Sequence, residues 1–129
     1  MDLALEIATP ERLIVSEQVT EVQVPGRAGY FGVLPGHAPL LSELASGVLT
    51  YVGQGRPQVL AVLGGFVEVL PDRVRVLADA ARRKEEIDAA AAKQDLDKAQ
   101  AALATAADPD VALAEVERAQ ALVNAAAAS

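Results

Sequence analysis

The sequence of 129 residues contains no cysteine and no tryptophan, and aromatic residues make up only 3% of it. Disulfide bonds and thiolate chemistry are therefore excluded, and the absence of cysteine is compatible with a reducing compartment. A hydrophobic core has to be built from valine, leucine, isoleucine and alanine. The length leaves room for one domain and an appendage, since single domains usually have about 100 to 150 residues.

Positive charge is also scarce in this chain. It has 11 lysine and arginine residues against 18 aspartate and glutamate residues, which gives a net charge of -7. Proteins that bind nucleic acids neutralise phosphates with clustered basic side chains, and no basic stripe is present here. We therefore expect no nucleic-acid partner.

Long hydrophobic runs are missing as well. The longest, residues 59–67, is interrupted by two glycines and is much shorter than the roughly 20 residues that a membrane-spanning helix needs. The opening MDLALEIATP lacks the basic start of a secretion signal. We expect neither a targeting peptide nor a membrane span, so any contact with a membrane requires an anchor from another subunit.

Up to about residue 77, apolar and polar residues alternate with the period of a strand, whose successive side chains point to opposite faces. Many short segments of this kind, with no helical period between them, indicate an antiparallel sandwich or barrel rather than a parallel α/β sheet. The residues expected on the buried faces include Leu3, Leu5, Ile7, Val22, Val24, Val74 and Val76.

Glycine and proline punctuate these β-prone segments. Gly53-Gln54-Gly55 and Pro71-Asp72 each lie between two such segments. Proline presets the φ angle of a turn, and glycine adopts positive φ without a steric cost. Both stretches therefore predict β-hairpins.

Beyond residue 83 glycine is absent, Pro109 is the only proline, and the apolar period becomes helical. One stripe comprises Ala89, Ala92, Leu96, Ala99, Leu103 and Ala106, and a second comprises Ala112, Val116, Ala119, Val123 and Ala126. Between them, Asp108 offers an N-cap carboxylate and Pro109 suits the first position of a helix. These features predict an antiparallel helical hairpin that turns at Asp108.

The predicted organisation is an N-terminal all-β domain over residues 1–83 and a two-helix C-terminal domain over residues 84–129. The helical stripes are mostly alanine, and burial contributes roughly 0.8 kcal/mol per CH₂ group, compared with about 1.5 to 3 kcal/mol for a leucine. Ordering a residue costs about 1 to 2 kcal/mol. We therefore expect the hairpin to be marginally stable alone and to pack against the β domain or a partner protein.

Two arrangements superficially resemble ligand sites. Gly26, Gly29 and Gly32 are not followed by a Lys-Ser/Thr pair, so they are interpreted as turn glycines rather than a phosphate loop. His37 is the only histidine and has no cysteine or acidic cluster nearby, which disfavours a metal site. We expect a loop histidine or one that contacts a partner.

A catalytic set is also possible on paper. Ser42 or Ser46 could be combined with His37 and Glu43, but adjacency in sequence is not the geometry of a triad. A small hydrolase is therefore a disfavoured alternative, and no cofactor is expected. Another alternative is a free-standing β-sandwich adaptor whose helical arm binds an unrelated partner.

Residues 26–41 read GRAGYFGVLPGHAPLL, which resembles the signature of the epsilon subunits of bacterial F-type ATP synthases. Further similar segments follow in the same order: LGGFVEV at 63–69, VLADAA at 76–81 and Ile87-Asp88, where the helical part of that family begins. The similarity extends over essentially the whole chain, although the tail beyond about Lys93 agrees in pattern only.

The resemblance implies a non-catalytic rotor subunit with a β-sandwich and two C-terminal helices. Its implied partners are the gamma subunit, the ring of membrane-embedded c subunits and the catalytic alpha/beta head. Its implied location is the cytoplasmic face of the bacterial plasma membrane, where it is bound peripherally through the ring. The central stalk to which it belongs would couple rotation of the ring to ATP synthesis.

The resemblance also implies roles for particular residues. The implied contacts with the c-ring are Arg27, Tyr30, Phe31 and His37; those with gamma are Leu40, Leu41 and Ser42; and that with the catalytic beta subunit is Arg118. The family often has a charged residue where Tyr30 stands, so the ring contact here is expected to depend more on packing. If Tyr30 and Phe31 alternate as strand residues, one ring points inward and the other outward.

The chain departs from the family pattern in its helical segment. Some epsilon subunits bind ATP through a segment Ile/Leu-Asp-x-x-Arg-Ala, in which the arginine can pair with the triphosphate. The corresponding residues 87–92 read IDAAAA, so Ala91 replaces the arginine. We expect no appreciable ATP binding. Because Arg118 is the only basic residue on the second helix, we also expect weak autoinhibition of ATP hydrolysis.

Overall fold

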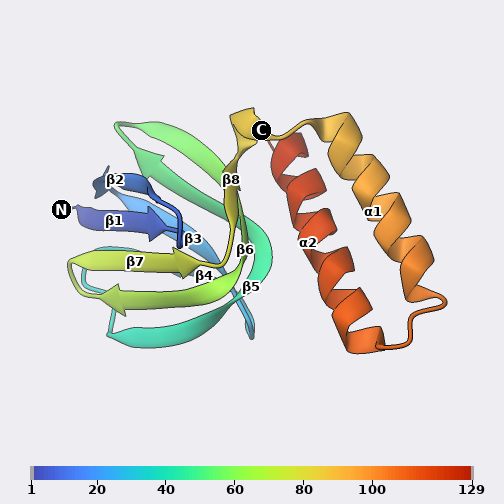
Figure 1. Cartoon of the computed structure of the whole chain (residues 1–129). Helices are drawn as coiled ribbons and strands as arrows, with labels where there is room; N and C mark the ends of the chain where they lie inside the picture. Colours follow the sequence, from blue (N-terminus) through green and yellow to red (C-terminus); the bar gives the residue numbers. More distant parts are fainter. Residues whose placement is uncertain (1, 129) are drawn as a thin grey trace.

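The computed structural model describes residues 2–128 and contains a curved β-sandwich flanked on one side by a pair of helices (Figure 1). The strands are β1 (Leu3–Ala8), β2 (Leu13–Val19), β3 (Glu21–Gly26), β4 (Gly29–Val33), β5 (Leu40–Gly53), β6 (Arg56–Leu70), β7 (Arg73–Ala78) and β8 (Ala81–Arg83). A 3-10 turn, η1 (Lys84–Glu86), then leads to α1 (Ala89–Leu103) and α2 (Pro109–Ala127). The predicted order of an all-β part followed by a helical hairpin is confirmed.

Hydrogen bonding joins the strands in the order β2-β1-β7-β6-β5-β3-β4, with β8 paired to β6. All pairs are antiparallel except β1–β7, which is parallel and aligns Ala4 with Arg73. The parallel pair was not predicted, because its strands are far apart in the sequence and no local turn signal connects them. The antiparallel character of the sandwich is otherwise as expected.

The long strand β6 takes part in both layers of the sandwich. Its residues 65–70 pair with β7, whereas its residues 60–62 pair with β8. Between these two portions, Gly64 and Gly65 have φ angles of 78° and 121°, which side chains other than glycine rarely adopt. A Cβ atom on Gly65 would also collide with the carbonyl oxygen of Leu77. These two glycines therefore allow β6 to bend from one layer into the other.

The core lies between the two layers and contains the residues that alternation placed on buried faces. The side chains of Leu3, Leu5, Ile7, Val22, Val24, Val74 and Val76 are each at most 1% exposed. Their neighbours in one cluster include Tyr51, whose ring supplies the largest buried side chain. The prediction of half-buried strands from period two is confirmed.

The turn between β5 and β6 has the geometry that its sequence predicts. Gln54 and Gly55 have φ angles of 56° and 74°, as in the two-residue turns that match the twist of antiparallel strands. The β6–β7 turn falls at Pro71-Asp72. Both predicted hairpins are confirmed.

The helices begin where their capping residues predict. The Asp88 carboxylate accepts a hydrogen bond from Ala91 N at 3.1 Å. The Asp108 carboxylate accepts from Asp110 N and Val111 N, and Pro109 occupies the first turn of α2. The hairpin therefore turns at Asp108, as expected. Neither α1 nor α2 is long and apolar enough to cross a membrane.

Helix α2 packs on both sides, which the single predicted stripe did not anticipate. Ala119 is buried on the predicted stripe, whereas Ala121 lies about 200° further around the helix, at 100° per residue. Ala121 and Ala125 pack against Val59, Ala61 and Leu63 of β6. Helix α1 contacts α2 and lies on its far side from the sandwich (Figure 1). The small alanine side chains thus allow neighbouring elements to approach α2 closely on two of its faces.

Candidate interaction surfaces

The β3–β4 hairpin ends in an exposed tip at Arg27. The Arg27 N–H donates to the Glu43 carbonyl at 3.0 Å, and its side-chain Nε lies 3.6 Å from Glu43 Oε2. Both side chains are mostly exposed, so this ion pair orients the arginine more than it stabilises the fold. The tip is held against the first half of β5.

Tyr30 and Phe31 follow the tip on β4 and point to opposite faces, as alternation predicts. Phe31 packs against the core cluster, whereas the Tyr30 side chain is mostly exposed. The Tyr30 hydroxyl nevertheless has an internal partner, since it accepts a hydrogen bond from Val48 N at 2.9 Å. Only part of Tyr30 is therefore free to contact another protein.

This hydrogen bond fills a gap in the pairing of β3 with β5. Gln23 pairs with Thr50 and Gly26 pairs with Leu44, so residues 45–49 of β5 lie opposite only two residues of β3. The Tyr30 hydroxyl supplies an acceptor where the ladder is interrupted. A Cβ atom on Gly47 would lie 2.7 Å from that hydroxyl, so the glycine makes room for it.

His37 lies in the loop that follows β4, beyond the end of the strand opposite to Arg27. The ring Nδ1 of His37 is 2.7 Å from the Ala38 carbonyl oxygen, and the backbone N–H of His37 donates to Leu34 O. The neighbouring Gly36 N–H donates to Pro71 O at the β6–β7 turn. The four residues proposed for the ring contact are therefore distributed along both ends of β4 rather than gathered in one cluster.

The arrangement around His37 does not resemble a catalytic triad. The Ser42 hydroxyl donates to the Glu43 carbonyl at 3.1 Å, and His37 Nδ1 contacts a backbone oxygen of its own loop. No hydrogen bond between His37 and either Ser42 or Ser46 is found within residues 2–128. These contacts give no support to a hydrolase.

The outer face of the β5–β6–β7 layer carries three exposed apolar side chains, which we call the outer patch: Leu41, Phe66 and Leu77. They are 72%, 53% and 53% exposed. Phe66 pairs directly with Leu77 across the sheet, and Leu41 lies diagonally from Phe66. Exposed apolar groups that are contiguous in this way are typical of interaction sites.

A charged row borders the outer patch. Arg75 Nε lies 3.6 Å from Glu6 Oε2, and its Nη1 lies 3.9 Å from Glu68 Oε1. Glu68 pairs across the sheet with Leu41 on one side and Arg75 on the other. Glu43 pairs across the sheet with Phe66, so charged side chains lie directly beside the apolar ones of the patch.

The structure separates the residues that were proposed to contact gamma. Leu41 belongs to the outer patch, whereas Leu40 and Ser42 alternate to the face of β5 that carries buried Leu44. Phe66 and Leu77 were not among the residues predicted to contact a partner, although each occupies a strand position where alternation places polar residues. A large apolar side chain at a solvent-facing strand position was the signal in the sequence that could have identified these two residues.

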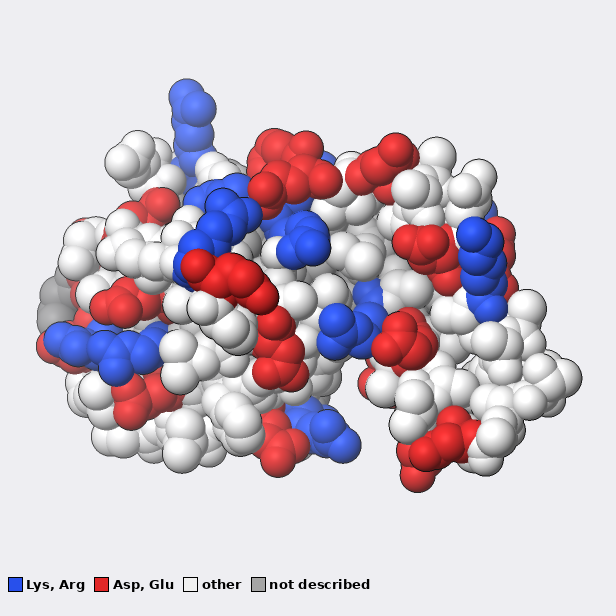
Figure 2. Space-filling model, in the orientation of Figure 1, with Lys and Arg blue, Asp and Glu red and all other residues white. Residues whose placement is uncertain are grey.

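Arg118 lies half-buried on the side of α2 that faces the sandwich. It lines a cleft of about 500 Å³ together with Arg27 and Asp79. Figure 2 shows this face of the molecule hollowed between the sandwich and the helical pair, with both signs of charge around the opening. In this arrangement the arginine proposed to contact the beta subunit is directed toward its own sandwich.

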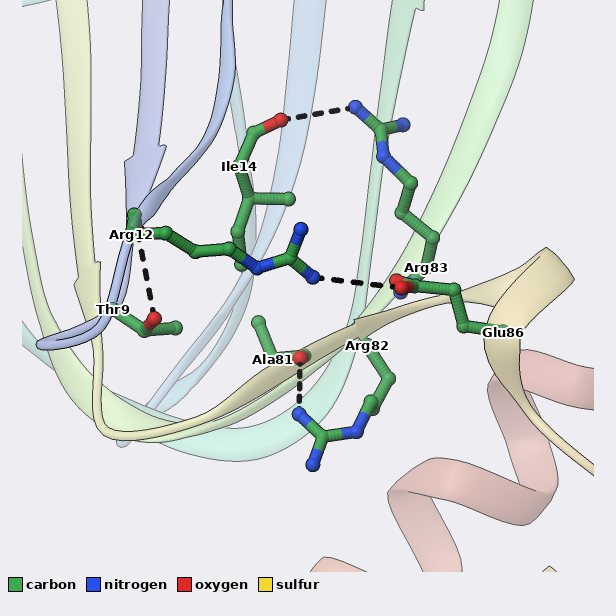
Figure 3. A network of polar contacts seen from close by, with 7 residues as sticks. All are labelled: Thr9, Arg12, Ile14, Ala81, Arg82, Arg83 and Glu86. Carbon is green, nitrogen blue, oxygen red and sulfur yellow. Dashed lines mark hydrogen bonds and ion pairs between the residues drawn. The ribbon is translucent and has the colours of Figure 1, made fainter.

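A polar network joins the end of the sandwich to the segment that leads into the helices (Figure 3). Arg83 Nη2 donates to Ile14 O at 3.1 Å, and Arg12 Nη2 lies 3.4 Å from Glu86 Oε2. The other oxygen of Glu86 accepts from the Arg83 N–H at 3.0 Å. We call Arg12, Ile14, Arg83 and Glu86 the linker clamp.

The electrostatics of the clamp favour the ionised form of Glu86. The hydrogen bond from the Arg83 N–H, together with the nearby Arg12 guanidinium, lowers the pKa of the Glu86 carboxyl.

The buried Tyr51 also has a polar partner, since its hydroxyl donates to Glu17 Oε2 at 3.5 Å. Burial raises the pKa of Tyr51, while a hydrogen bond from Arg83 acts in the opposite direction.

A shallow hollow lies where the family segment for ATP would be expected. It is lined by Arg82, Glu86, Ile87, Asp88, Ala91, Ala92, Asp95 and Leu122. Three of these residues are acidic and one is basic. This charge balance opposes a triphosphate, in agreement with the replacement of arginine by Ala91.

Comparisons with known proteins are consistent across most of the chain. The family model "ATP synthase, Delta/Epsilon chain, beta-sandwich domain" matches residues 2–84. The ATP synthase epsilon chain of Solibacter usitatus is 57% identical over 122 residues, covering 92% of this chain and 91% of the relative. That of Koribacter versatilis is 48% identical over 100 residues, covering 78% and 70% respectively.

A solved structure has the same fold. A chain in the Euglena gracilis mitochondrial ATP synthase, a cryo-EM structure of OSCP/F1/c-ring, superposes with a TM-score of 0.82 at 24% identity. The match covers 94% of this chain and 79% of that one. It extends over both the sandwich and the helical pair.

Proposed function

This chain belongs to the family of ATP synthase epsilon chains, and from that premise we propose that it is a non-catalytic subunit of the central stalk. In this role it couples rotation of the c-ring to the catalytic alpha/beta head. This role requires one surface that binds the gamma subunit and another that contacts the c-ring. It requires no reaction centre. The contacts around His37 and Ser42 are compatible with the last requirement.

The observation that carries the proposal is the outer patch. Leu41, Phe66 and Leu77 expose apolar surface on one layer of the sandwich, while α2 covers part of the other layer. Burial of a leucine or phenylalanine side chain contributes about 1.5 to 3 kcal/mol, so three such groups can anchor a partner. We assign this patch to the gamma subunit, so that Phe66 and Leu77 join Leu41 in the proposed contact, whereas Leu40 and Ser42 lie on the opposite face of β5.

The proposed ring contact is the tip of the β3–β4 hairpin. Arg27 is exposed there, and the face of Tyr30 remains available although its hydroxyl is engaged. Phe31 supports the contact from the core, and His37 would take part only if the ring also reaches the loop after β4. The membrane is approached through the ring, at the cytoplasmic face of the plasma membrane.

We propose that residues 84–129 form a regulatory arm that is separate from the sandwich of residues 1–83. The arm is docked by small side chains: Ala121 and Ala125 each bury a methyl group, which contributes about 0.8 kcal/mol per CH₂. Such docking is weak enough to be reversible. With Arg118 as the only basic residue of α2, inhibition of ATP hydrolysis by the arm should be slight.

The test is binding of the chain to purified gamma subunit. Leu41→Glu places a carboxylate in the outer patch, where burial without a partner is costly. We expect it to weaken binding by at least about tenfold, which corresponds to 1.4 kcal/mol. Phe66→Ser should have a similar effect.

Leu113→Glu is the matched control, because Leu113 is also an exposed leucine but lies on α2, away from the outer patch. It should leave gamma binding unchanged. Equal binding by all three variants would remove the gamma surface from the outer patch. Failure of the unmodified chain to co-purify with gamma and the catalytic head would favour an adaptor instead.

A further inference from the structure

The linker clamp occupies a place where the sandwich lacks strand pairing. Strand β8 pairs with β6, and β2 is at one end of the strand order, paired only to β1. Side chains connect β8 to β2 instead: Arg83 reaches Ile14 O, and Arg12 reaches Glu86 (Figure 3). Residues 81–86, which comprise β8 and η1, therefore have polar contacts with both layers, although η1 is not part of the sheet.

The helical pair has a different kind of attachment. Ala121 and Ala125 of α2 pack against the sandwich, together with the partly buried Leu122. None of the hydrogen bonds or ion pairs found within residues 2–128 connects α1 or α2 to a strand. The clamp is polar and directional, whereas the helices are held by apolar contact alone.

Ile87 and Asp88 separate these two attachments. Both residues have an extended backbone. Ile87 N–H donates back to Lys84 O, and Asp88 O accepts forward from Ala92 N. Rotation about the Ile87 ψ and Asp88 φ angles moves the helices without breaking either bond.

We infer that the linker clamp keeps residues 81–86 on the sandwich when the helical pair leaves it, so that the pair turns about Ile87–Asp88. This inference rests on the proposed function of the arm as a movable unit. It moves the working boundary between the two units from residue 83 to residue 86. Glu86 is then a positioning residue that sets where the arm begins.

The test uses the complete chain without partners, observed by amide NMR shifts and hydrogen exchange. Ala125→Asp places a charge at the docking surface, and Ala121→Lys is a second variant in case the first does not fold. Undocking is recognised by changed amide shifts at Val59, Ala61 and Leu63. Residues 81–83 pair with residues 60–62 of β6, so their shifts follow those of β6 in any case, and amide exchange is the readout for the clamp. We expect Arg83 exchange to stay within about threefold on undocking.

Glu86→Gln in the same background removes the charge that pairs with Arg12 and weakens the acceptor for the Arg83 N–H. We expect it to accelerate Arg83 exchange at least about tenfold. Glu85→Gln is the matched control, because Glu85 is the adjacent exposed acid and is outside the clamp; it should have no such effect.

Three outcomes would overturn the inference. In the first, Arg83 exchange accelerates by much more than threefold on undocking, although Glu86 is unchanged. In the second, Glu85→Gln and Glu86→Gln have equal effects. In the third, both charged variants fold with β6 shifts unchanged, because the arm then does not move. Binding to gamma is measured separately, so failure here is distinguishable from failure of the proposed function.

Discussion

The hydroxyl of Tyr30 and the backbone N–H of Val48 form a hydrogen bond of 2.9 Å at the point where the β3–β5 ladder is interrupted. A residue proposed for contact with the ring is thus also part of the internal structure of the sandwich. The position has two roles, and substitutions there must be interpreted with both in view.

Tyr30→Phe keeps the ring but removes the acceptor for Val48 N–H. A typical intramolecular hydrogen bond contributes about 0.5 to 1.5 kcal/mol, so we expect a loss of about 1 kcal/mol in the free energy of unfolding. Urea denaturation measures this loss.

Ser42→Ala is the control for Tyr30→Phe. It also removes a hydroxyl, but its acceptor, Glu43 O, keeps the hydrogen bond from Arg27 N. The control should change stability by less than about 0.5 kcal/mol. Equal stability of Tyr30→Phe and the unmodified chain would show that Val48 N–H finds water instead.

Acid should weaken the linker clamp. Because the folded state lowers the pKa of Glu86, the stabilisation is present above the unfolded pKa, about 4.3, and is lost as pH falls through the folded value. The carboxyl carbon shift of Glu86 should therefore titrate below the usual range, and Arg83 amide exchange, corrected for its intrinsic pH dependence, should accelerate over the same pH interval. Arg12→Ala should move the titration upward. An unmoved titration in that variant would mean that the ion pair is not formed in solution.

The chain should not bind ATP appreciably. Ala91 replaces the family arginine, and the hollow beside it has acidic side chains at Glu86, Asp88 and Asp95. Isothermal titration calorimetry should give no detectable binding at micromolar ATP. Ala91→Arg is the informative comparison, since it supplies the missing cation. Micromolar binding by the unmodified chain would contradict the prediction.

Removal of residues 85–129 should leave assembly with gamma intact and change ATP hydrolysis by less than about twofold, because a single arginine on α2 supplies a small charge attraction. Hydrolysis by the reconstituted complex is the measurement. Removal of residues 87–129 is the matched control, because it retains Glu86 and the clamp. A several-fold rise in hydrolysis with both truncations would demonstrate strong inhibition by the arm.

Local signals in the sequence were sufficient for most of the fold. Alternation identified Leu3, Leu5 and Ile7 as core, and Asp108 predicted the helical turn, because period and capping depend on neighbours in the chain. The parallel β1–β7 pair and the second packing face of α2 depend on residues that are distant in sequence. Alanine is compatible with either face, so its pattern could not show that Ala121 and Ala125 dock on β6.

The interaction surfaces were less predictable than the core. The motif around residues 26–41 drew attention to Tyr30 and His37, but it did not reveal that the Tyr30 hydroxyl is engaged or that His37 lies beyond the other end of β4. Phe66 and Leu77 come together only through cross-strand pairing. The linker clamp likewise depends on Arg12 and Glu86 meeting across the open edge of the sandwich.

The parallel pairing of β1 with β7 also has a consequence for synthesis. Ala4 cannot meet Arg73 until nearly the whole sandwich sequence has left the ribosome, so β1 and β2 must wait as an isolated hairpin, which is at best marginally stable. The β5–β6 hairpin, by contrast, can close as soon as it emerges. Nascent chains should therefore acquire protection first in the middle of the sandwich and last at the N-terminal strand.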